Sequence, residues 1–119
     1  MRIKSLCFKM IKSKKDRELK DQILVMIEFV EKYTFGLSEN EFYQNDLVKD
    51  ACLMRLTIIR ELAGKFSAIF KDENNKINWQ EIKAARNFYV HQYGQVDWTT
   101  VWEVKEKYLS MLKNYLIQL

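Results

Sequence analysis

Apolar side chains recur every three or four residues through four long segments of this chain, and that spacing constrains the fold more than any other feature. No window shows the strict alternation of a half-buried β-strand. The sequence also has no proline and only three glycines, so little interrupts a helix. We therefore expect an all-α protein.

Capping and turn residues divide the chain into four main helices and one additional short helix. Gly36 favours the end of the first helix, and Ser38 with Glu41 forms a capping box for the short one. A second capping box is Asn78 with Glu81, and Asp97 can cap the last helix. The predicted helices are 16–34, 39–45, 46–70, 79–93 and 98–117. Short connections between them favour an antiparallel four-helix bundle.

Helical periodicity predicts which side of each long helix is buried. In 16–34 the buried side comprises Leu19, Ile23, Met26, Ile27, Val30 and Tyr33. In 46–70 it comprises Leu47, Ala51, Met54, Ile58, Leu62, Phe66 and Ile69. In 98–117 it comprises Val101, Trp102, Lys105, Tyr108, Leu109, Leu112 and Leu116. The three tryptophans are expected to pack in the core.

Positive charge is concentrated at the N-terminus. The net charge is +4, yet residues 1–20 carry eight basic and two acidic side chains, whereas the remainder is slightly acidic. We expect a basic N-terminal arm over 1–15 and a helical domain over 16–119. The arm either contacts nucleic-acid phosphates or is a solvated tail, and the second interpretation is favoured.

Cys7 and Cys52 form no metal-binding or redox pattern. Two thiols without a secretory signal favour a reducing cytoplasm. No apolar run approaches the length of a membrane helix, so no membrane association is expected.

The stretch RNFYVHQY, residues 86–93, concentrates polar chemistry near the end of a predicted helix. On a continuous helix Asn87 and His91 share one face, and Arg86 and Tyr93 lie on nearly one line. An arginine can clamp a phosphate, and a histidine can transfer a proton near neutral pH. Cleavage of RNA by its own 2′-hydroxyl needs such groups and no metal.

The chain has only one histidine, whereas this cleavage works best with two proton-transfer groups. A symmetric dimer would supply two copies of His91, so we predict a composite site across a homodimer. The alternative is structural, because a lone histidine near a helix end is often a favourable dipole contact. From spacing alone the structural interpretation is favoured.

The pattern Arg86-x-x-x-x-His91-x-Tyr93, with Asn87 after the arginine, resembles the signature of HEPN-domain ribonucleases, and specifically of HepT-like toxins. The resemblance covers about residues 16–119. It also rests on the blocks YTFGLSENEF, DLVKDACLMRLTIIRELA, INWQEIKAARNFYVHQY and VDWTTVWEV, which occur in the family's order and spacing.

That resemblance implies an all-helical, dimeric endoribonuclease that needs no metal or other cofactor. It implies the toxin of a HEPN/MNT toxin–antitoxin pair, whose nucleotidyltransferase antitoxin transfers AMP to the signature tyrosine. Carried over, Arg86 and His91 are catalytic, Asn87 and Glu61 support them, and Tyr93 is modified. The alternative is a non-catalytic helical module that binds a nucleotide or partner. Gln92 and Arg60 depart from the family, which often has glycine at both positions, and this puts groove shape and substrate preference in question.

Overall fold

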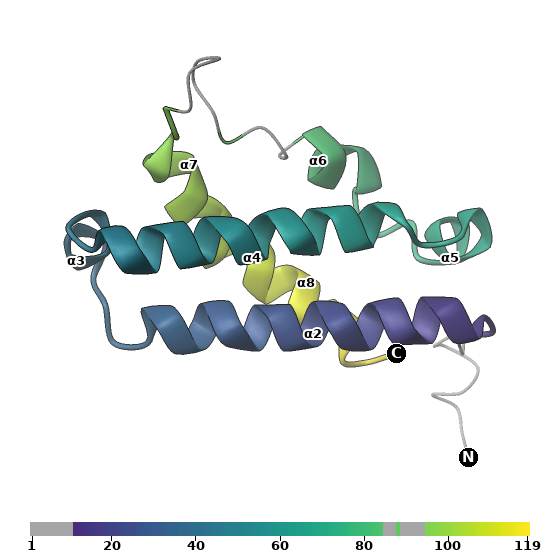
Figure 1. Ribbon diagram of the computed structural model, residues 1–119. Coiled ribbons are helices and arrows are strands. Elements are labelled where there is room, and N and C mark those ends of the chain that lie inside the picture. Colours follow the sequence, from purple (N-terminus) through teal and green to yellow (C-terminus); the bar gives the residue numbers. More distant parts are fainter. Residues whose placement is uncertain (1–10, 85–87, 89–94) are drawn as a thin grey trace.

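The computed structural model describes residues 11–84, Phe88 and 95–119 (Figure 1). These residues form helices and contain no β-strand, so the predicted all-α class is confirmed. The elements are α2 Lys14–Thr34, α3 Glu39–Tyr43, α4 Asp46–Gly64, α5 Ala68–Glu73, α6 Trp79–Ala84, α7 Trp98–Glu103, the π-helix η1 Val104–Tyr108 and α8 Leu109–Leu116.

The start and end of α2 follow from local hydrogen bonding. Ser13 is its N-cap, because the Ser13 side chain accepts from the Asp16 backbone N at 3.2 Å, and the helix begins two residues before the expected Asp16. Beyond the helix end, Gly36 has φ +76°, a left-handed conformation that glycine adopts without penalty. The predicted role of Gly36 is confirmed.

The long helix predicted over 46–70 is wrong beyond Gly64. The chain leaves the helix at Lys65, and a second helix, α5, begins at Ala68. Ser67 caps α5 by accepting from the Phe70 backbone N at 3.1 Å. Ser67 also donates to the buried Asp16 carboxylate, through its backbone N at 3.0 Å and its hydroxyl at 2.6 Å. This contact across 51 positions stabilises the break, and apolar periodicity carries no sign of it.

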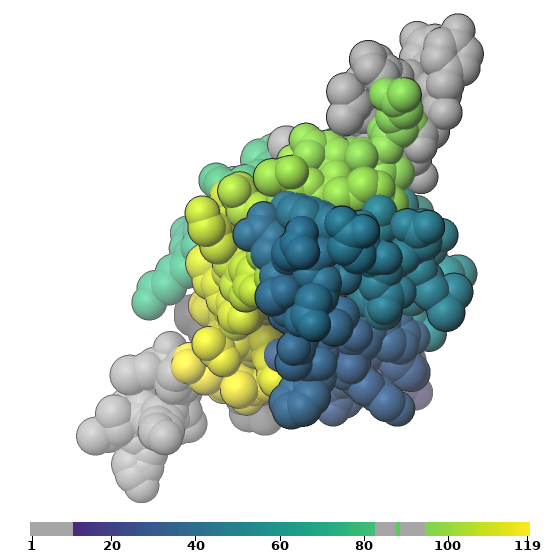
Figure 2. All heavy atoms as spheres, turned by 90° about the vertical axis from the view of Figure 1, so that its left-hand side faces the viewer, coloured from purple at the N-terminus to yellow at the C-terminus, as the bar shows by residue number. Residues whose placement is uncertain are grey.

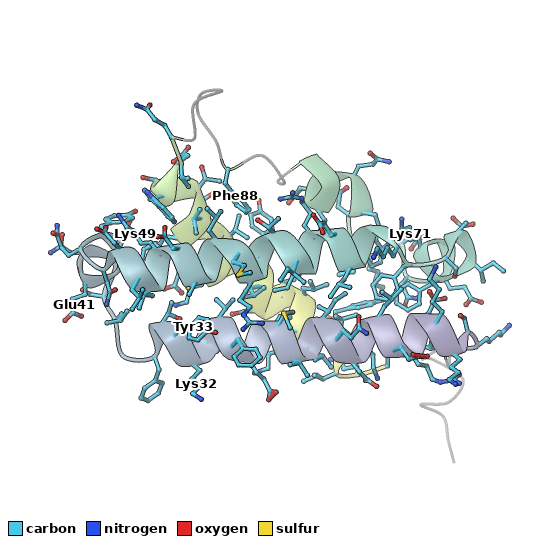
Figure 3. The ribbon with its side chains drawn as sticks, in the orientation of Figure 1. Lys32, Tyr33, Glu41, Lys49, Lys71 and Phe88 are labelled. Atoms are coloured by element: carbon cyan, nitrogen blue, oxygen red, sulfur yellow. The ribbon has the colours of Figure 1, made fainter. Side chains whose placement is uncertain are left out.

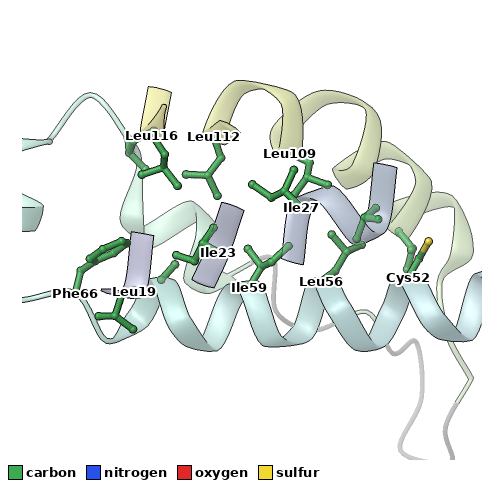
Figure 4. Packing of buried hydrophobic residues seen from close by; sticks show 14 of the residues in the cluster. Leu19, Ile23, Ile27, Cys52, Leu56, Ile59, Phe66, Leu109, Leu112 and Leu116 are labelled. Carbon is green, nitrogen blue, oxygen red and sulfur yellow. The ribbon is translucent and has the colours of Figure 1, made fainter. Parts of the chain in front are cut away.

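The buried side of α4 also differs from the prediction. Leu47 and Met54 are 82% and 64% exposed, and Ile69 of α5 is 66% exposed, although all three were expected in the core. The core side of α4 instead comprises Cys52, Leu56, Ile59 and Ala63. The helix carries apolar residues on two sides, and the side with Cys52, Leu56 and Ile59 packs into the core with residues of α2 and α8 (Figure 4). The predicted buried side of α2 is confirmed. Its residues Leu19, Ile23, Ile27 and Val30 are buried, and Met26 and Tyr33 are partly buried.

Helices α2 and α4 lie side by side and antiparallel, and the C-terminal helices cross behind them (Figure 1). Viewed from the α3 end, α7 lies over α4, and the chain that follows it runs through η1 and α8 down one side of the stacked α4 and α2 (Figure 2). Leucine and isoleucine side chains from α2, α4 and α8 meet in the core (Figure 4). None of the helices in the described part of the chain is both long and apolar enough to cross a membrane.

The last predicted helix forms, but with a π-helical turn in its middle. Asp97 caps α7 as expected, and Val101, Leu109, Leu112 and Leu116 are buried. A π-turn inserts an extra residue and rotates the next part of the helix about its axis, which fits the finding that Tyr108, expected on the inner side, is 38% exposed. Lys105 is largely buried, and its Nζ lies over the Trp102 ring, 4.5 Å from the ring centroid.

The helix predicted over 79–93 is described only as α6, Trp79–Ala84. Phe88 lies within the predicted span and is not helical, so a continuous helix is wrong at that position. The antiparallel pair α2 and α4 is as expected, whereas the full antiparallel four-helix bundle stays a prediction, because the third main helix is described over Trp79–Ala84 alone.

Candidate functional site

Four of the five candidate site residues, Arg86, Asn87, His91 and Tyr93, lie outside the described residues. Their proposed roles therefore stay predictions. Because Phe88 is not helical, their alignment on one continuous helix loses its basis. The structure does describe what surrounds the signature in the chain: α6 before it, Phe88 within it, and Asp97 with α7 after it.

Phe88 is held at both its side chain and its backbone. Its side chain is only 3% exposed and joins the core, on the α7 side of α4 (Figure 3). Its carbonyl accepts a hydrogen bond from the Asp97 backbone N at 2.6 Å. The signature is thus attached to the folded domain at its third residue.

Asp97 itself is fixed by the first turn of α7. Its carboxylate accepts from the Thr100 hydroxyl at 2.8 Å and from the Thr100 backbone N at 3.2 Å. Hydrogen bonding from the Thr100 side chain, and then from its backbone, lowers the pKa of Asp97 from its ordinary value. The carboxylate therefore stays ionised at neutral pH and remains a strong cap.

A cavity of about 370 Å³ lies between α4, α6 and the C-terminal helices, and Phe88 forms part of its wall. We call it the apolar cavity, because Leu56, Ile59, Ile82, Val104 and Leu112 also line it. Polar side chains also line it, among them Arg60, Glu81 and Tyr108. A hydrogen bond to the Glu81 carboxylate raises the pKa of Tyr108, so its phenol stays protonated at physiological pH.

Glu61, the fifth candidate, lies on the exposed side of α4 beside a second cavity of about 440 Å³. Gln80 and Ile82 of α6 line the same cavity, so Glu61 faces the helix that leads into the signature. Arg60 is half-buried and lines both cavities. The bulky Arg60, at a position where the family often has glycine, therefore lies between the two cavities.

Within the described residues no group of three or more His, Cys, Asp or Glu side chains is arranged to hold a metal ion. The signature offers chemistry through its own side chains. A guanidinium, an imidazole and an amide close in sequence can bind a phosphodiester and transfer protons.

Sequence reasoning underestimated two residues near the signature. It assigned Asp97 as a helix cap, which is confirmed, and Phe88 is a buried core residue. It had no means to see that the Asp97 N–H binds the Phe88 carbonyl, because backbone hydrogen bonds leave no trace in residue identity. The pattern Asp97-x-x-Thr100 is the one available signal, since it marks where the first turn of α7 is fixed.

Comparison with known proteins places the chain in a family. The family described as "HepT-like: Ribonuclease HepT-like" matches residues 23–119. The "Gamma-glutamylcyclotransferase and putative RNase MJ0434" of Methanocaldococcus jannaschii is 30% identical over 99 residues, which are 83% of this chain and 45% of that protein. The "Putative RNase TTE0752" of Caldanaerobacter subterraneus subsp. tengcongensis is 27% identical over 85% of this chain and 90% of its own length.

A third relative, the "Putative RNase MJ1380" of Methanocaldococcus jannaschii, is 26% identical over 77% of this chain and 84% of its own length. The chain thus spans less than half of the first relative and most of the other two. No solved structure matches the chain. The family match covers most of the helical domain and the whole signature, so the chain belongs to the HepT-like ribonuclease family.

Proposed function

We propose that this protein is a metal-independent endoribonuclease and the toxin of a HEPN/MNT toxin–antitoxin system. The observation that carries the proposal is the family match over residues 23–119, which includes Arg86, His91 and Tyr93 in the signature spacing. Family membership supports the ribonuclease class. The site chemistry, the dimer and the antitoxin are our inferences.

In the proposed reaction the RNA supplies its own nucleophile. One His91 imidazole takes the proton of the 2′-hydroxyl, whose oxygen attacks the adjacent phosphorus. The bond to the 5′-oxygen breaks, and a second imidazole gives that oxygen its proton. Arg86 binds the phosphate oxygens as negative charge builds up, and Asn87 supports the imidazole. The products are a 2′,3′-cyclic phosphate and a 5′-hydroxyl.

Two imidazoles require two chains, because the sequence holds a single histidine. We propose a two-fold symmetric homodimer whose two signatures face one groove. Glu61, which is exposed beside α6, would support this groove from α4.

Control of the toxin is proposed to act at Tyr93. A nucleotidyltransferase antitoxin would transfer AMP from ATP to the Tyr93 hydroxyl, with pyrophosphate as the leaving group, and so add bulk and about one negative charge. Both would exclude an RNA phosphate from the groove.

The Tyr93→Phe variant tests this modification, and Tyr89→Phe, which removes another hydroxyl of the same stretch, is its matched control. Tyr93→Phe should abolish the mass increase of one adenylyl group on incubation with the antitoxin and ATP, whereas Tyr89→Phe should retain it.

The decisive experiment is cleavage of RNA by the purified protein in the presence of EDTA. We expect products with 2′,3′-cyclic phosphate ends, and His91→Ala should reduce kcat about 10²- to 10⁴-fold. Lys107→Ala, an exposed cation on η1, serves as the control and should retain activity. RNA that stays intact with the wild-type protein, or a fully active His91→Ala variant, would contradict the proposal and favour the non-catalytic binding module.

A heterodimer of one wild-type and one His91→Ala chain, purified through two different tags, tests the composite site. Independent sites predict half of the wild-type activity. A site that needs both imidazoles predicts less than about a tenth. Retention of half of the activity would refute the shared groove but leave the ribonuclease assignment intact.

A further inference from the structure

We propose that Asp97 is a positioning residue for the signature. Through its backbone N–H and its helix cap, it holds Phe88 and thereby limits where Arg86 and His91 can lie. This inference rests on the proposed function, because it assigns a role relative to the proposed catalytic pair.

Phe88 is an anchor for the chain around it. The Phe88 side chain is 3% exposed, and its carbonyl accepts from the Asp97 backbone N at 2.6 Å. A buried side chain and a bonded carbonyl together fix both the position and the direction of the backbone at that residue. Phe88 is two positions from Arg86 and three from His91, so this anchor lies between the two.

The donor of this hydrogen bond is itself fixed. Asp97 has φ −82° and ψ 88°, and its two carboxylate oxygens accept from the Thr100 backbone and hydroxyl. Its own carbonyl accepts from the Val101 backbone N at 3.1 Å, and Val101 is completely buried. The Asp97 N–H is therefore held by α7, which packs against the core. Removal of the carboxylate loosens the turn that aims this N–H at Phe88.

The anchor has a consequence for catalysis. Catalytic groups must be held closely in the productive geometry, and a misplacement of about 1 Å can reduce the rate about 10²-fold. Arg86 and His91 stand on either side of one anchored residue in the sequence. Loss of the anchor should therefore reduce kcat while RNA binding, and hence KM, changes little.

The test compares three variants that each alter a helix cap. Asp97→Ala removes the cap, Asp97→Asn keeps a capping side chain of equal rank, and Thr100→Val removes the hydroxyl partner. Asn45→Ala is the control, because Asn45 caps α4 through a single bond from the Val48 backbone N at 3.0 Å. Circular dichroism first establishes that each variant is folded at the assay temperature.

We expect Asp97→Ala to lower kcat about 10²-fold, with KM nearly unchanged. Thr100→Val should act in the same direction with a smaller loss. Asp97→Asn and Asn45→Ala should stay close to wild type. A folded Asp97→Ala with the activity of Asn45→Ala would overturn the proposal. An Asp97→Asn as inactive as Asp97→Ala would also overturn it, since the charge rather than the cap would then be required.

Two measurements are independent of RNA cleavage and so separate this inference from the proposed function. Amide hydrogen exchange at Asp97 should be slow in wild type and Asn45→Ala and fast in Asp97→Ala. His91 is the only histidine, so one imidazole NMR signal reports its surroundings. That signal should shift in Asp97→Ala and not in Asp97→Asn or Asn45→Ala. An unchanged signal in Asp97→Ala would refute the positioning role even if the wild-type protein cleaved no RNA.

Discussion

Replacement of Asp16 by alanine should destabilise the domain more than any other substitution of a charged residue on α2. Asp16 is 3% exposed, and its carboxylate accepts from the backbone N and the hydroxyl of Ser67 at 3.0 and 2.6 Å. The two residues are 51 positions apart and join the start of α2 to the start of α5. The variant would leave the Ser67 donors without this partner.

The expected loss follows from the number and kind of these hydrogen bonds. A hydrogen bond to a charged group contributes about 1.5–3 kcal/mol. Two such bonds would give up to about 6 kcal/mol, but burial of a carboxylate carries a desolvation penalty that the variant no longer has. We expect a net loss of about 3 kcal/mol in the free energy of unfolding. For a domain of this size that corresponds to a fall in Tm of about 12 °C.

Urea unfolding of a double-mutant cycle provides the assay. Ser67→Ala removes the hydroxyl, which both donates to Asp16 and caps α5, and should cost about 2 kcal/mol. The double variant should lose at least about 1 kcal/mol less than the sum of the single losses. Asp21→Ala is the control, since this exposed carboxylate of α2 has one loose ion pair, with Lys20 at 3.9 Å. An Asp16→Ala loss below about 1 kcal/mol, or additive losses in the cycle, would refute the reasoning.

Two other predictions concern thiol reactivity and pH. Burial raises the pKa of the Cys52 thiol to about 11. In a Cys7→Ser variant, which leaves Cys52 as the one thiol, a disulfide reagent at pH 8 should therefore modify Cys52 only as fast as the domain unfolds. Rapid modification of this variant in its native state would contradict the prediction. Hydrogen bonds from Thr100 lower the pKa of Asp97 in the folded protein. The ionised Asp97 cap therefore stabilises the fold fully above the unfolded pKa of about 3.9. This stabilisation is lost as the pH falls through the lower pKa of the folded state. Urea unfolding between pH 2 and 6 measures the free energy of unfolding of wild type and of Asp97→Asn. The difference in favour of wild type should shrink in the acidic part of that range. A difference that does not vary with pH would refute the assignment.

Local signals predicted the helix starts well because a cap is encoded in a few adjacent residues. Ser38 and Glu41 form both bonds of the predicted capping box. Asn78 accepts from the Glu81 backbone N at 3.0 Å, and Asp97 caps α7. Each of these contacts spans three positions, so the sequence contains all of its participants.

The faces of α4 could not be predicted from periodicity alone. Leu47, Met54 and Ile58 recur with helical spacing, and so do Cys52, Leu56 and Ile59 on another side. Which set is buried depends on where α2 and α8 pack, and that information lies elsewhere in the chain. The break after Gly64 has the same origin, since Ser67 is fixed by Asp16 from the distant start of α2.

The candidate site shows why polar spacing and packing must be considered together. Helical geometry aligned the polar residues of the signature, but it assumed that the apolar residue among them was a passive part of the helix. Phe88 is instead a non-helical residue with a buried ring and a bonded carbonyl. We infer that this anchored residue, which lies within three positions of both Arg86 and His91 in the sequence, restrains the chain where a continuous helix was expected to do so. If Arg86 and His91 are the catalytic pair, as proposed, their relative position should depend on the contact between Phe88 and Asp97 more than on helical register.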